Sequence, residues 1–152
     1  MLKIEKCTIK TFDCLDTLLS WNDFKILAEA RTIERLEIEN ILDTDGRKVP
    51  IEDICDYVPN LNYLFSNRTH VTTKTMQKIC KSLISTNMER FSMNSVDGLL
   101  NAEDYLEFIK IRPNAWFSVF FSSVVSDDQE TLFKTVVKSE IKKWPEQKPR
   151  FH

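Results

Sequence analysis

Hydrophobic residues recur along the chain in a weak repeat. Its template has apolar residues at the first, fourth and sixth positions and an apolar or small residue at the ninth. Copies begin at Met1, Ile33, Val58, Met88 and Asn114, so their starts are 32, 25, 30 and 26 residues apart. The central apolar pair is two residues apart, the period of a strand with one buried face. We therefore predict one strand in each copy, at intervals that overlap the long end of leucine-rich repeats.

Between these strands the apolar spacing changes to i, i+3, i+4, which is typical of amphipathic helices. Thr72 or Thr73, Asn101 and Ser126 are candidate N-caps, and Ser126 with Gln129 fits a capping box. We predict helices over residues 12–30 (with a possible break near residues 20–23), 50–57, 72–85, 102–111 and 126–144. The apolar stripe of the last helix comprises Leu132, Phe133, Val136, Val137, Ile141 and Trp144.

Strands that alternate with helices favour an α/β fold with a mainly parallel sheet and right-handed crossovers. Because the unit repeats, we predict a leucine-rich-repeat-like open solenoid of strand–helix units. Residues 1–145 are expected to form one domain, and residues 146–152 a loosely held tail.

Composition narrows the possible functions. The net charge is −2 with interspersed signs, and there are two glycines, so we expect neither nucleic acid nor a phosphate-binding glycine loop. The four cysteines form no CxxC pair, and we predict reduced thiols, no metal and no cofactor. The charged N-terminus and the lack of a long apolar run favour an intracellular chain, cytoplasmic or nuclear, that does not enter a membrane.

The alternation within each strand also predicts a binding surface. Residues between the buried positions face away from the helices, onto a sheet surface that an open solenoid exposes to a partner. Aromatic and amide side chains on this face suit a protein partner, and we expect a monomeric binder. The candidate binding residues are Trp116, Ser118, Phe120, Arg90, Ser92, Asn62 and Glu37.

Four segments resemble the repeat region, one type of which is called the FTH region, that follows the F-box in many nematode F-box proteins. They are "LLSWNDFKILAEARTIERLEI", "TIERLEIENI", "VPIEDICDYVPNLNYL" and "LLNAEDYLEFIKIRPNAWFSVFFSS", and the first two overlap. The resemblance implies a module that recognises substrates of a ubiquitin ligase and has no catalytic residues. A Leu-Pro-type F-box motif is not found near Met1, so the chain is either a fragment or binds without recruiting a ligase itself.

An enzymatic alternative rests on residues 41–46. A strand that ends in Asp43-Thr44-Asp45-Gly46 resembles the first motif of haloacid-dehalogenase-like phosphatases, in which the first Asp attacks phosphorus and the second is the general acid/base. Ser66 and the pair Asp127 and Asp128 would supply the phosphate and metal contacts. Metal-dependent phosphatase turnover that is abolished by Asp43→Asn would favour this alternative; we predict that the chain is not an enzyme.

Overall fold

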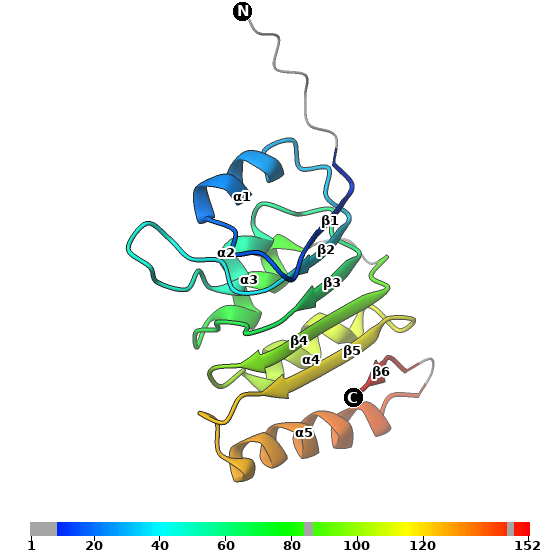
Figure 1. Ribbon diagram of the computed structural model, residues 1–152. Helices are drawn as coiled ribbons and strands as arrows, with labels where there is room; N and C mark the ends of the chain where they lie inside the picture. Colours follow the sequence, from blue (N-terminus) through cyan, green and yellow to red (C-terminus); the bar gives the residue numbers. More distant parts are fainter. Residues whose placement is uncertain (1–8, 84–86, 146–147) are drawn as a thin grey trace, which may run out of the picture.

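The computed structural model describes residues 9–83, 87–145 and 148–152, which alternate strictly between strand and helix (Figure 1). The strands are β1 (Thr11–Cys14), β2 (Arg35–Ile38), β3 (Tyr63–Ser66), β4 (Arg90–Val96), β5 (Trp116–Phe121) and β6 (Arg150–Phe151). The helices are α1 (Trp21–Ala28), α2 (Ile51–Cys55), α3 (Thr75–Ser82), α4 (Ala102–Lys110) and α5 (Asp127–Lys142).

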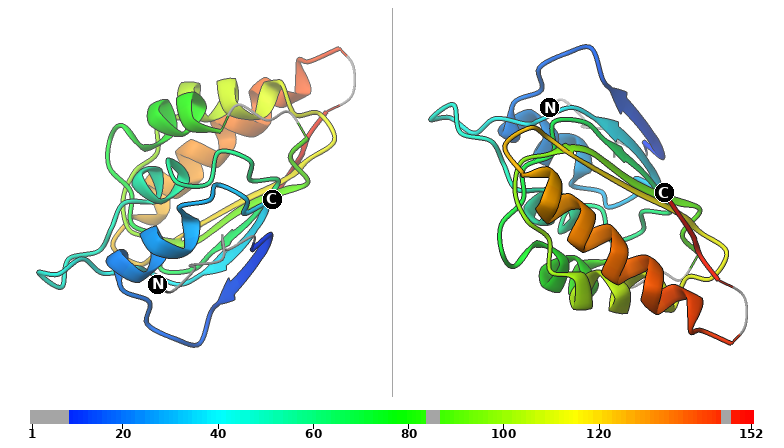
Figure 2. Two further views of the ribbon diagram at one scale, coloured as in Figure 1. Left: turned by 90° about the horizontal axis from the view of Figure 1, so that it is seen from above. Right: turned by 90° about the horizontal axis from the view of Figure 1, so that it is seen from below.

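The six strands form one open sheet whose spatial order, β1 to β6, is the order of the chain. Every pair of neighbouring strands is parallel. The helices lie on one side of the sheet, and no described helix covers the other side (Figure 2). The predicted α/β class with a parallel sheet is therefore confirmed.

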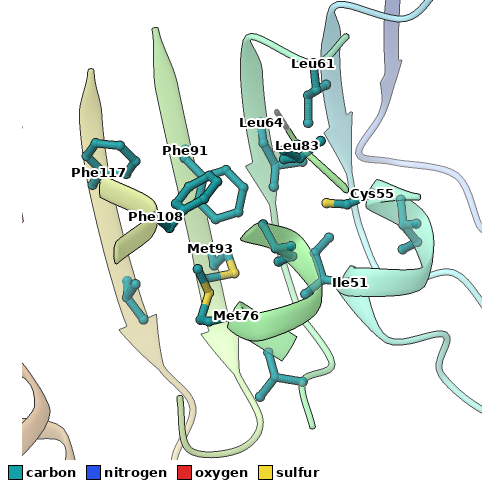
Figure 3. Close-up of a cluster of buried hydrophobic side chains, with 14 of the residues drawn as sticks. Ile51, Cys55, Leu61, Leu64, Met76, Leu83, Phe91, Met93, Phe108 and Phe117 are labelled. Atoms are coloured by element: carbon teal, nitrogen blue, oxygen red, sulfur yellow. The ribbon is translucent and has the colours of Figure 1, made fainter. Parts of the chain in front are cut away.

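The core fills the space between the sheet and the helices. Leu36, Leu64, Phe91 and Phe117 lie side by side on successive strands, and all four are fully buried. Phe108 of α4 points into this row, with its ring centroid 4.8 Å from that of Phe91 and 6.0 Å from that of Phe117 (Figure 3). The inward positions of each strand thus bury the apolar surface that drives folding.

A side chain caps the start of three of the described helices, and Ser20 caps α1 by accepting a hydrogen bond from the Asp23 amide. Ser126 and Gln129 make the predicted capping box of α5, and the Asn101 side chain accepts a hydrogen bond from the Asp104 amide at the start of α4. The prediction that Thr72 or Thr73 caps α3 was wrong, because Lys74 is its N-cap residue and no side chain makes a cap hydrogen bond. Thr72 and Thr75 instead donate their hydroxyl hydrogens to the buried carboxylate of Glu52, at 2.6 and 2.8 Å.

The helix predicted over residues 12–30 was wrong in its first half. Residues 11–14 form β1, which pairs with β2 so that Phe12 lies beside Leu36, and helix α1 begins only after the N-cap Ser20. The apolar residues of this segment fit either period, and pairing with the edge of β2 decides the conformation. The first copy of the repeat, from Met1, falls mostly outside the described residues.

Residues 150–152 also differ from the loosely held tail that we expected. Arg150 and Phe151 form β6, the Arg150 amide donates to the carbonyl of Ala115, and the His152 amide donates to the carbonyl of Phe117. Phe151 packs on the core with its ring 5.8 Å from that of Tyr105. Exposed backbone groups at the β5 edge provide the hydrogen-bond partners that hold this short segment.

Candidate binding surface on the open sheet face

The open sheet face is defined here as the side of the sheet opposite the helices. Five neighbouring positions on it, one from each of β2 to β6, alternate between guanidinium and aromatic ring. They are Arg35, Tyr63, Arg90, Trp116 and Arg150, which the strand register places side by side. We call this set the arginine–aromatic row.

Each arginine of the row lies near an aromatic ring. The guanidinium carbon of Arg35 is 3.6 Å from the ring centroid of Tyr63, and that of Arg150 is 6.0 Å from the Trp116 ring. Arg90 lies 5.9 Å from both Tyr63 and its neighbour Phe65. The ring quadrupole attracts a cation held over its face, so the rings orient these otherwise flexible side chains.

The charges of the row are unevenly compensated. Arg35 forms an ion pair with Glu37 at 2.9 Å, and the hydrogen bond to that carboxylate raises the pKa of the Arg35 guanidinium. Arg90 instead donates through Nε to the hydroxyl of Ser92, a neutral acceptor. Among the described residues, Arg90 and Arg150 form no ion pair. The β4–β6 part of the open face therefore carries two guanidinium charges without a carboxylate partner.

Two of the predicted binding residues are buried rather than accessible. Ser92 and Ser118 do lie on the open side of the sheet, but they are 0% and 4% exposed. The hydroxyl of Ser118 donates to that of Ser92 at 2.8 Å, and Ser92 accepts from Arg90. Ser92 thus holds the Arg90 side chain of the row in place, and Ser118 in turn contacts Ser92. The prediction that these two serines contact a partner is corrected, because they are buried.

The other predicted residues are at least partly accessible. Trp116 is 38% exposed and stacks on the His152 ring at 4.6 Å, while Phe120 is 49% exposed and lies 4.9 Å from the Lys134 ammonium group of α5. The neighbours Phe117 and Val119 are fully buried, as the alternation predicts. The two exposed rings therefore have different surroundings: Trp116 belongs to the row, and Phe120 adjoins helix α5.

Tyr63 and Phe65 were not predicted as binding residues because the third copy of the repeat, from Val58, was placed three residues too early. With the copy starting at Val58, Tyr63 was expected inward and Leu64 outward; the structure buries Leu64 and turns Tyr63 and Phe65 outward. Asn62 precedes β3, where its carbonyl accepts from the amides of residues 89 and 90. If this copy starts at Leu61, the spacings between copies are 28, 27 and 26 residues. This more regular spacing indicates the correct register of β3 from the sequence.

The residues of the phosphatase alternative have local structural partners. Asp43 Oδ1 accepts hydrogen bonds from the amides of Asp45 and Arg47, both at 2.9 Å, in a turn where Gly46 has φ of +74°. Asp43 follows β2, whereas Asp127 follows β5 and begins α5. Three strand spacings, roughly 14 Å, separate β2 from β5 in the sheet. Within the described residues, no cluster of three or more His, Cys, Asp or Glu side chains could hold a metal ion.

The cysteines that the structure describes, Cys14, Cys55 and Cys80, are free thiols, and Cys7 lies outside the described residues. Burial raises the pKa of the Cys55 and Cys80 thiols, which makes their reactive thiolate forms scarcer. None of the helices in the described ranges combines the length and apolar character needed to span a bilayer.

Comparisons with protein-family models, curated proteins and solved structures gave no significant match for this chain. The functional inference therefore rests on the surface itself.

Proposed function

We propose that this chain is a protein-binding module of the leucine-rich-repeat-like solenoid type, and that its partner lies across the open sheet face. The arginine–aromatic row is the observation that carries the proposal. Tyr, Trp and Arg are the residue types most enriched among binding hot spots, because each combines a large contact area with directed polar groups. A role in substrate recognition, as in the F-box-associated region that the sequence resembles, would use the same face of an intracellular protein.

The charge of the face indicates the chemistry of the partner. Arg90 and Arg150 lie two strands apart, roughly 10 Å, with the Trp116 ring between them. Carboxylates are the natural partners for two guanidiniums that have no internal ion pair, and Arg can bind them in a bidentate geometry. We therefore expect an acidic protein segment that places an apolar or aromatic group on Trp116.

Arginine beside aromatic rings also suits single-stranded nucleic acid, but two features favour protein. The chain is acidic overall, with a net charge of −2, and the same face carries the carboxylates of Asp13 and Glu37. Nucleic-acid affinity rests on many phosphate contacts, and only two arginines of the row are free of an internal carboxylate partner. An oligonucleotide is therefore the competing ligand in the test.

The test selects peptides from a random displayed library against the folded chain and measures the binding of the selected peptides. We expect enrichment of Asp and Glu, and a loss of roughly tenfold or more in affinity for Arg90→Gln combined with Arg150→Gln. The matched control combines Arg31→Gln with Arg47→Gln, two exposed arginines outside the row, and should retain affinity.

Two results would contradict the proposal. Selected peptides that bind the row variant as tightly as the parent would place the binding site elsewhere. Tighter binding of a labelled oligothymidine or oligouridine than of any peptide at physiological salt, lost in the same variant, would assign the row to nucleic acid.

A further inference from the structure

Helix α5 buries only part of its apolar stripe. Phe133, Val137 and Ile141 are at most 8% exposed, as the helical period predicts, but Leu132 is 66% exposed and Val136 is 40% exposed. The helical period thus predicts the stripe, but only one side of it packs on the core. Helix α4 is the neighbour of α5 on the same side of the sheet (Figure 2), and Leu132 and Val136 line the space between the two helices.

The exposed edge of α5 lines a hollow between the two helices. Leu132 and Val136 face it together with Leu99, which is 47% exposed, and its volume is about 360 Å³. A second hollow of about 500 Å³ adjoins it and shares Val136. The two form one groove, which we call the α4–α5 groove.

The two ends of the α4–α5 groove differ in chemistry. The first end is mainly apolar, whereas the second combines Leu106, Val136 and Trp144 with four carboxylates and one ammonium group, those of Glu103, Asp104, Glu107, Glu140 and Lys110. Glu140 forms an ion pair with Lys143, at 3.2 Å. In the part of the chain that the structure describes, Glu103, Asp104 and Glu107 take part in no ion pair.

Local stability explains only some of these acids. Glu103 and Asp104 lie in the first turn of α4, where carboxylates favour the positive end of the helix dipole. Glu140 lies near the end of α5, where it pairs with Lys143, whereas Glu107 lies beyond the first turn of α4 and forms no ion pair with a described residue. Four carboxylates against one ammonium group give this end of the groove a net negative charge.

We propose that the α4–α5 groove binds an amphipathic helix of a partner protein, with apolar side chains at one end and Lys or Arg at the other. Helix-in-groove recognition uses apolar anchors at i, i+3, i+4 and i+7, and such a row would contact Leu99, Leu132 and Val136. The basic side chains would then meet Glu103, Glu107 and Glu140. The same acids disfavour an anionic lipid surface, and this site is separate from the open sheet face.

The probe is a synthetic amphipathic helix of about 14 residues, some 21 Å long, built from Leu on one face and Lys toward one end. Its fluorescent form is titrated with the full chain and anisotropy is measured. We expect binding that weakens by roughly tenfold or more when the lysines are replaced by glutamates or when the peptide sequence is scrambled.

Variants of the chain, titrated with the same probe, test whether the probe binds in the α4–α5 groove. Leu132→Ser with Val136→Ser, and separately Glu103→Gln with Glu107→Gln, should each weaken the probe by roughly tenfold. Val124→Ser, an apolar residue that is 73% exposed just before α5, is the matched control and should not change affinity. Arg90→Gln with Arg150→Gln should also leave the probe unaffected, which separates this site from the proposed function.

Equal binding of the probe to the parent and to both groove variants would overturn the proposal. So would equal binding of the scrambled and helical peptides. Light scattering provides a third test: a dimer that Leu132→Ser with Val136→Ser converts to monomer would make the groove a contact between two copies of the chain and exclude the partner helix.

Discussion

Strand β2 offers a direct test of the two-faced sheet, because adjacent residues on it lie in opposite environments. Leu36 is fully buried on the helix side, and Glu37 is partly exposed on the open face, where it pairs with Arg35. Truncating a fully buried leucine removes its transfer free energy and leaves a cavity, so Leu36→Ala should lower the free energy of unfolding by about 2–5 kcal/mol. Glu37→Ala loses one partly exposed ion pair, and pairs of this kind are worth about 0.2–1 kcal/mol.

Urea unfolding followed by circular dichroism measures both effects. With a slope of about 2 kcal/mol per molar urea, a loss of about 3 kcal/mol lowers the midpoint by about 1.5 M for Leu36→Ala, and Glu37→Ala should shift it by less than about 0.5 M. The slope itself should not change in either variant. If Glu37→Ala destabilised the fold as much as Leu36→Ala, both sides of the sheet would be covered, and the open sheet face could not be the binding surface.

Two further predictions concern a helix start and a buried thiol. Ser126→Ala should lower the free energy of unfolding by about 1 kcal/mol because it removes the cap of α5. The control in thermal unfolding is Ser123→Ala, which changes an exposed residue outside the capping box. Equal melting temperatures of the two variants would argue against a stabilising role for the cap. In the native protein, iodoacetamide should label the partly exposed Cys14 well before Cys55, because burial blocks access to the Cys55 thiol and raises its pKa. Peptide mass spectrometry measures the labelling of each cysteine. Early labelling of Cys55 would mean that α2 opens readily.

Local patterns in the sequence were sufficient to predict the four central strands and most of the helices. The helical periods of α3, α4 and α5, the caps Asn101 and Ser126, and the inward pair Leu36 and Ile38 all depend on residues close to one another in the chain. Such short-range preferences, together with the rule that strand–helix units form parallel sheets, led to the α/β class.

The pairing of distant segments could only be decided by the tertiary structure. Residues 11–14 and 150–151 carry weak local signals and become strands because the edges of β2 and β5 supply hydrogen-bond partners. Likewise, the outward position of Tyr63 follows from its register against Arg35 and Arg90, each more than 20 residues away along the chain. A shift by an odd number of residues moves a side chain to the other face of the sheet, and local periodicity did not prevent the three-residue shift on β3.

For the two candidate surfaces as well, the sequence supplies the residues and the tertiary structure brings them together. The sequence contains the arginines and aromatic rings of the row, but their alternation exists only across five strands of the folded sheet. It also contains the apolar stripe of α5, but only the folded structure shows that Leu132 and Val136 stay exposed beside α4. Local sequence thus determined which side chains each element presents, and the packing of elements decided which of them meet, because those contacts join residues far apart in the chain.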